Sequence, residues 1–90
     1  MDLVRILPTT NAAPELARSA VDLAVGHSLP PADADAVKAL ADELLTETVS
    51  RAGDRIVEFR IRSEPRSVRL EVRWTESTTE QYLWAERSIA

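Results

Sequence analysis

The feature that most constrains this sequence is a long stretch of helical periodicity from Asp33 to Ala52. Its apolar positions recur at spacings of three and four, which places them on one helix face. That face comprises Val37, Leu40, Ala41, Leu44, Thr48 and Val49. Asp33 or Asp35 is expected to cap the first turn, and Gly53 supplies the left-handed conformation that often ends a helix. An amphipathic helix of this length must cover another apolar surface.

Two alternating segments after Gly53 predict that surface, a β-hairpin with its turn at Pro65. Its apolar positions are Val57, Phe59, Ile61, Val68, Leu70, Val72 and Trp74. Charged residues occupy the alternate positions, so one face of the hairpin is buried and the other is wet.

The register of this hairpin is predicted from its charges. Pairing Phe59 with Val72 places Arg60 opposite Glu71, whereas pairing Phe59 with Leu70 places like charges opposite one another. Because like charges in directly opposed positions are unfavourable, we predict the pairing of Phe59 with Val72.

The N-terminal third predicts a strand and a shorter helix. Met1 to Leu7 is a short apolar strand, and Pro14 suits the first turn of a helix that ends near Gly26. Leu16, Ala20 and Leu23 mark one face of that helix, with Ala17, Val21 and Ala24 beside them, and the alanines predict close packing against another element.

The C-terminal tail allows two interpretations. Ser77 followed by Glu80 resembles a capping box, which favours a short helix from Gln81 to Ile89. Tyr82, Leu83 and Trp84 are also compatible with another strand. The fold class is therefore α+β: residues 1–90 form a single two-layer domain in which two helices pack on one face of an antiparallel sheet, with topology β-α-α-β-β plus a short C-terminal element.

Composition excludes several classes of function. The chain has two glycines, too few for a phosphate-cradling loop, and no cysteine for a disulfide, thiolate zinc site or cysteine nucleophile. A net charge of −4 argues against general nucleic-acid binding. Without an apolar run of membrane length or a signal segment, we expect a cytoplasmic protein with no membrane contact.

A few residues are candidates for a site. Glu43 and Glu47 lie four residues apart, either on a solvated helix flank or as a carboxylate pair that could hold a cation. His27 is the single histidine, and its position beside Gly26 favours a helix-capping role over catalysis.

Two further sets are candidates for binding a partner. Arg60 and Arg62 form either a salt-bridged outer sheet face or a surface for an anionic partner. Tyr82 and Trp84, if exposed, are interface anchors.

The order of strand, helix, proline-rich link, long helix and hairpin resembles the GHKL (histidine-kinase-like) ATPase domain, particularly the small actinobacterial anti-sigma-factor type with serine-kinase activity. Ala39 to Ala52, ALADELLTETVSRA, carries the closest match, with Glu43, Leu44 and Thr46 at family positions. The resemblance covers about Leu3 to Trp74. It implies that Glu43 stands at the family's general-base position.

The chain departs from the family where nucleotide is held. The family's Mg²⁺-binding asparagine falls at Glu47, and its adenine-reading aspartate falls at about Trp74. The glycines of the phosphate-binding lid are missing. The resemblance therefore implies a degenerate, truncated relative without a cofactor or enzymatic activity.

We expect a regulatory protein–protein interaction module with Tyr82, Trp84, Arg60 and Arg62 as its partner-binding residues. A homodimer is one form that this interaction could take. Two alternatives remain open. One is an active Mg-ATP-binding serine kinase that uses Glu43 and Glu47. The other is an unrelated α+β domain that binds an anionic partner through its arginines.

Overall fold

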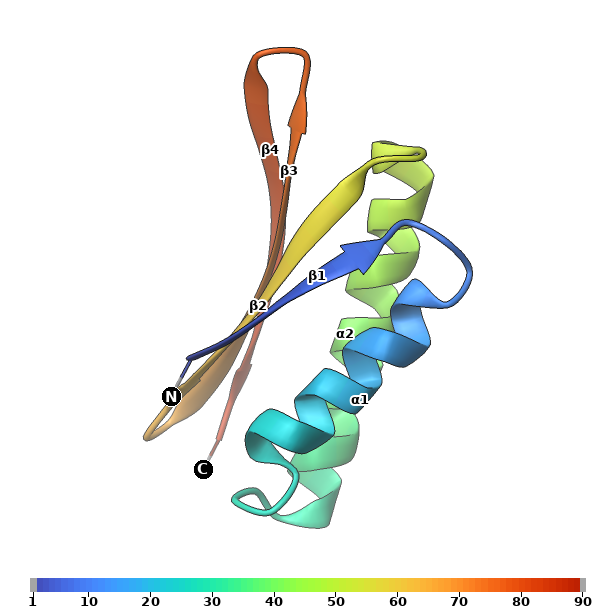
Figure 1. The fold of residues 1–90 in the computed structure, drawn as a ribbon. Helices are drawn as coiled ribbons and strands as arrows, with labels where there is room; N and C mark the ends of the chain where they lie inside the picture. Colours follow the sequence, from blue (N-terminus) through green and yellow to red (C-terminus); the bar gives the residue numbers. More distant parts are fainter. Residues whose placement is uncertain (1, 90) are drawn as a thin grey trace.

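The structure, a computed structural model, describes residues 2–89, which form two helices and four strands in the order β-α-α-β-β-β. The elements are β1 (Asp2–Pro8), α1 (Ala13–Val25), α2 (Pro31–Ala52), β2 (Ile56–Glu64), β3 (Ser67–Glu76) and β4 (Thr79–Ser88). The strands form one antiparallel sheet in the order β1-β2-β3-β4. Both helices lie on the same face of this sheet (Figure 1), so the predicted α+β class is confirmed.

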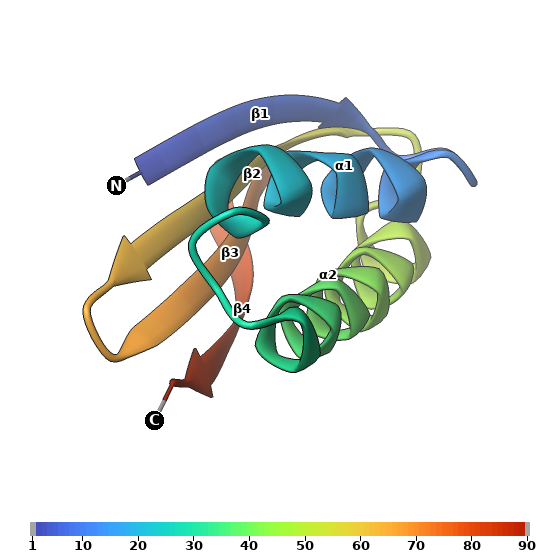
Figure 2. The same ribbon diagram turned by 90° about the horizontal axis from the view of Figure 1, so that it is seen from below.

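The core lies between the helices and the inward side chains of the strands. Phe59, Leu70 and Val72 of the central strands are fully buried, as are Val37 and Leu45 of α2. Figure 2 shows how the helices divide the sheet, with α1 beside β1 and β2 and α2 toward β3 and β4. Each helix thus shields one half of the apolar sheet face from water, which is the main stabilising term in a domain of this size.

The predicted close packing of the α1 alanines is confirmed, but its two leucines are not buried. Leu16 and Leu23 are 43% and 69% exposed, whereas Ala20 is buried as expected. The helix instead packs through a stripe of mostly small residues: Ala13, Ala17, Ala20, Val21 and Val25. Small side chains let α1 approach α2 and the sheet closely, which leaves the two leucines on the outer side.

The predicted start of α2 is two residues too late and its predicted aspartate cap is absent, whereas its predicted end is confirmed. The helix begins at Pro31 without a side-chain cap, because proline is already fixed near helical φ and the Pro30 carbonyl accepts from the Ala34 N–H at 3.0 Å. Asp33 instead forms an ion pair with Arg87 of β4 at 3.4 Å. Gly53 ends the helix with φ at 66°.

The register of the β2–β3 hairpin is the one predicted from charge. Phe59 pairs with Val72, Arg60 with Glu71 and Glu58 with Arg73. The apolar positions therefore share the helix-covered face of the sheet. The charged positions lie on the opposite face.

The preference for a C-terminal helix is wrong, because the tail forms β4 along the whole length of β3. Glu76 pairs with Thr79 across a tight turn in which Ser77 takes a positive φ of 57°, so Ser77 is a turn residue and not a helix cap. Leu83 faces the core and Trp84 faces away from it. β4 satisfies backbone groups that would otherwise leave β3 as an open edge.

Among residues 2–89, no helix combines the length and apolar character needed to cross a membrane.

Candidate functional site

Both helices lie on one face of the sheet, and the opposite face, here called the outer face, is left uncovered by any described element. Alternate strand residues point toward it. Its centre, on β2 and β3, is charged, and its two flanks are apolar. Ile6 and Ile56 are 64% and 69% exposed on one flank, and Tyr82 and Trp84 are 54% and 52% exposed on the other.

Glu71 is the centre of the charged strip and is only 4% exposed. Its Oε1 accepts a hydrogen bond from Arg69 Nε at 2.9 Å, and its Oε2 accepts one from Arg73 Nη2 at 3.3 Å. Burial acts to raise the pKa of Glu71, but the Arg69 hydrogen bond and the charges of Arg73, Arg62 and Arg69 outweigh it, so the pKa is lowered. Glu71 is therefore an ionised carboxylate held between two guanidinium groups.

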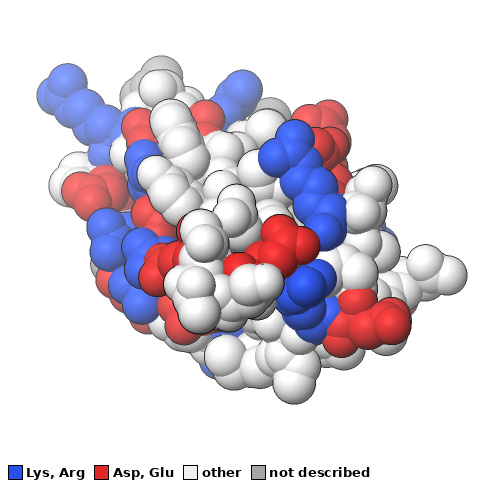
Figure 3. All heavy atoms as spheres, turned by 90° about the horizontal axis from the view of Figure 1, so that it is seen from above, with Lys and Arg blue, Asp and Glu red and all other residues white. Residues whose placement is uncertain are grey.

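The other ion pairs of the outer face leave none of its four arginines unpaired. Arg60 pairs with Glu58 at 3.4 Å, and Arg62 with Asp2 at 3.7 Å. Arg69 and Arg73 each reach a second carboxylate on β4, Glu86 at 3.8 Å and Glu80 at 3.7 Å. These pairs leave no concentrated positive charge on the outer face for an anionic partner. Figure 3 shows the end of the molecule that is uppermost in Figure 1, where basic and acidic side chains are also interspersed among uncharged surface.

The aromatic flank of the outer face is held in place by its neighbours. The guanidinium carbon of Arg69 lies 4.2 Å from the centroid of the Trp84 ring, a cation–π contact. Tyr82 lies opposite Arg73 on the same face. The four predicted partner-binding residues, Tyr82, Trp84, Arg60 and Arg62, therefore share one surface, although β3 separates the arginines of β2 from the aromatics of β4.

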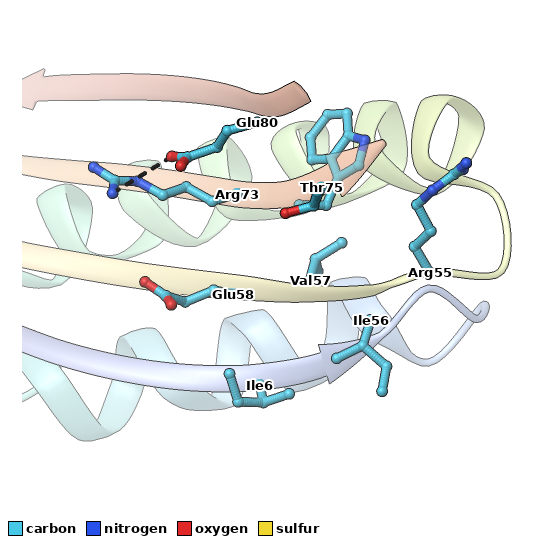
Figure 4. Close-up of a pocket in the computed structure, with 9 residues that line it drawn as sticks. Ile6, Arg55, Ile56, Val57, Glu58, Arg73, Thr75 and Glu80 are labelled. Atoms are coloured by element: carbon cyan, nitrogen blue, oxygen red, sulfur yellow. Dashed lines mark ion pairs between the residues drawn. The ribbon is translucent and has the colours of Figure 1, made fainter. Parts of the chain in front are cut away.

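A hollow of about 550 Å³ opens on the outer face where the end of β3 separates from β2. Pairing between these strands ends at Glu58 and Arg73, beyond which the β3–β4 hairpin bends away (Figure 1). Figure 4 shows Ile6 and Ile56 on one side of this hollow and the paired Arg73 and Glu80 on the other.

Trp74 also lines this hollow, and its indole N–H is a feature that the sequence did not indicate. The side chain is 6% exposed, as expected for the core, but its Nε1–H has no hydrogen-bond partner within the described range. An unsatisfied buried donor costs about 1–3 kcal/mol. Periodicity predicts only that the indole faces inward.

A smaller hollow of about 280 Å³ lies between α2 and β4. Its lining residues are Leu40, Glu43, Leu44, Glu47, Leu83, Trp84 and Ala85. This is where the structure places the two candidate carboxylates, and both are exposed to solvent. Glu47 pairs with Arg51 at 2.8 Å. No group of three or more His, Cys, Asp or Glu side chains suited to a metal occurs in the part of the chain that the structure describes.

His27 lies exposed in the turn that follows α1 and lines neither hollow described above. The Val25 carbonyl at this helix end accepts hydrogen bonds from the backbone N–H groups of Ser28 and Leu29, at 3.1 and 3.2 Å. The structure therefore brings Tyr82 and Trp84 onto one flank, places Glu43 and Glu47 beside that flank, and leaves His27 apart.

No protein-family model, curated protein or solved structure matches this chain. The GHKL resemblance therefore stays a prediction, and the surface geometry carries the functional argument.

Proposed function

We propose that this chain is a non-catalytic protein-binding module that recognises its partner through the aromatic flank of the outer face. The observation that carries the proposal is the exposure of Tyr82 and Trp84 on a sheet face that no described element covers. Aromatic side chains with one apolar face and one polar end are typical anchors of protein interfaces. A regulatory role is the form that the resemblance to anti-sigma-factor ATPases favours.

The charges support a protein partner over a polyanion. Every arginine of the charged strip is already paired, so a phosphate-rich ligand would have to displace carboxylates to gain contacts. A protein surface can instead cover the aromatic flank alone and leave these ion pairs at its rim, as in ordinary interfaces.

The small hollow supports a binding role over ATP chemistry. Its volume of about 280 Å³ lies near the lower end of ligand sites, and Glu43 and Glu47 would repel the phosphates of a nucleotide. The space farther in, between α2 and the sheet, is filled by buried side chains such as Leu45 and Phe59.

The test is site-specific photocrosslinking in the native host. A photoreactive phenylalanine analogue replaces Tyr82 in one variant and Leu23 in a control. Leu23 is 69% exposed but lies on α1, on the far side of the molecule from the outer face. We expect a discrete adduct with another protein from position 82 and none from position 23. Equal adduct formation from both positions, or none from position 82, would overturn the proposal.

A further inference from the structure

The two edges of the sheet are protected to different degrees. β1 carries Pro8, which lacks an N–H, and Arg5, a charged side chain on the helix-covered face. Both features discourage a further strand from pairing with an edge. β4 has neither feature at its centre, where five consecutive residues, Gln81 to Ala85, are uncharged and free of proline. β4 therefore presents backbone N–H and C=O groups along an edge that accepts another strand.

The small hollow lies beside this unprotected edge. Leu40 and Leu44 of α2 line it from above the sheet plane, and Leu83 and Ala85 line it from β4. A fifth strand placed next to β4 would direct alternate side chains toward α2 and cover these apolar groups. The hollow therefore lies where the inward side chains of a further strand would lie.

We propose that the neighbour is β4 of a second copy of this chain, joined antiparallel about a twofold axis at Trp84. A twofold axis that makes neighbouring strands antiparallel keeps the helices of both copies on one side of the joined sheet. Inward residues then oppose inward residues. This allows registers centred on single residues of β4, such as Leu83 or Trp84.

Charge separates these two registers. Centring on Trp84 pairs Tyr82 with Glu86 of the other copy and Leu83 with Ala85, and opposes no like charges. Centring on Leu83 pairs Glu80 with Glu86 twice in each dimer. Because opposed like charges destabilise a strand pair, the register centred on Trp84 is favoured.

The helices fit the same arrangement. α2 packs against β3 and β4 alike, so its axis lies over the boundary between them. Neighbouring strands are about 4.8 Å apart, which puts the two copies of α2 about 10 Å apart across the axis. That spacing is close to the 8–10 Å of packed helices. In the joined sheet, the aromatic flanks of the two copies form one continuous surface. The inference therefore rests on the proposed function, and it adds a second copy of the chain as the partner of the β4 edge.

A substitution of Glu43 can distinguish between two partners for the β4 edge, a second copy of this chain and a basic strand of another protein. Glu43 lies on α2 beside the proposed twofold axis, and it forms no ion pair with another described residue. Two copies would bring two Glu43 carboxylates near each other, so Glu43→Gln should tighten a self-dimer. It should weaken binding to a basic strand. Glu15→Gln, an exposed change on α1, is the control.

Sedimentation equilibrium from micromolar to millimolar concentrations measures the dimer. We expect Tyr82→Glu to raise the dissociation constant about ten-fold, because it opposes Glu86 twice per dimer, and the double variant Tyr82→Glu/Glu86→Lys to restore it. Both residues are exposed, so these changes spare the core. A chain that stays monomeric throughout, or a dimer that Tyr82→Glu leaves unchanged, overturns the inference.

Disulfide trapping tests the register, since the chain has no cysteine of its own. Trp84→Cys should form a disulfide-linked dimer on mild oxidation, because the two residues face each other across the axis. Tyr82→Cys should not, because its copies are offset by four residues, about 13 Å. Equal trapping of both variants, or trapping of the β1 control Ile6→Cys alone, overturns the register. If the chain is a monomer but position 82 still crosslinks to another protein, the dimer is refuted and the proposed function stands. If the chain dimerises but position 82 gives no adduct with another protein, the proposed function is refuted and the dimer stands.

Discussion

Replacing Glu71 with glutamine tests whether the charged strip is a structural network. The substitution keeps the shape of the side chain and removes its charge. Glu71 is 4% exposed and accepts hydrogen bonds from Arg69 at 2.9 Å and Arg73 at 3.3 Å. Glutamine has only one acceptor oxygen, and its NH₂ group would face a guanidinium that can only donate. At least one of the two hydrogen bonds is therefore lost.

The expected loss of stability follows from the burial of the groups involved. A hydrogen bond to a charged group contributes about 1.5–3 kcal/mol. The side chains of Arg69 and Arg73 are 29% and 41% exposed, so water partly replaces the lost partner. We expect Glu71→Gln to lower the free energy of unfolding by about 2 kcal/mol at pH 7, and Tm by about 8–16 °C. Thermal unfolding followed by circular dichroism measures both.

The stabilisation that Glu71 provides should depend on pH in a defined direction. The pKa of Glu71 is lower in the folded state than in the unfolded chain, so its contribution is complete above the unfolded pKa of about 4.3. It is lost as the pH falls through the folded value. The difference between wild type and Glu71→Gln should therefore narrow as the pH drops below about 4. An exposed control, Glu64→Gln, should change stability by less than about 0.5 kcal/mol. A stability gap that is absent at pH 7 or constant down to pH 3 would refute the reasoning.

Three further substitutions and one titration test other parts of the account. Leu45→Ala, at a fully buried position of α2, should cost about 2–5 kcal/mol in urea unfolding, and a cost below about 1 kcal/mol would contradict its place in the core. Thr9→Val should cost about 1 kcal/mol, because the Thr9 hydroxyl donates to the carbonyls of the loop after α2, including Arg55 at 2.6 Å. Gly53→Ala should cost about 1–2 kcal/mol because Gly53 has a φ of 66°, and an unchanged Tm would show that this turn relaxes. Calorimetric titration with Mg-ATP should give no binding heat, and a saturable signal abolished by Glu43→Gln would favour the kinase alternative.

The elements with strong periodicity could be predicted from the sequence. The period of α2 predicts most of its core positions but misses Leu45, which is fully buried. The change to alternation after Gly53 establishes which strand residues face the core, and charge selects the register of Phe59 with Val72. These features are local or depend on one neighbouring strand. The face of α1 was less predictable, because an alanine stripe and a leucine stripe lie side by side on one helix, and only the packing distance to α2 decides between them.

The tail and the site depend on contacts between distant segments. Ser77 and Glu80 have the spacing of a capping box, but the tail pairs with the edge of β3 and forms β4. No local sequence pattern indicates this pairing. The same pairing places Trp84 over Arg69 on the outer face. From the sequence alone, Trp84 could be named as an interface anchor only if it proved to be exposed. The small hollow beside Glu43 could not be predicted at all.

The most direct test of the proposed binding surface is hydroxyl-radical footprinting of Tyr82 and Trp84 in intact host cells, compared with dilute purified protein. Both side chains are about half exposed in the isolated chain, so both should react readily when it is pure. We expect their oxidation to fall several-fold in cells while that of the exposed Leu23 on α1 stays the same. Equal oxidation of Tyr82 and Trp84 in both settings would contradict the claim that a protein covers this flank.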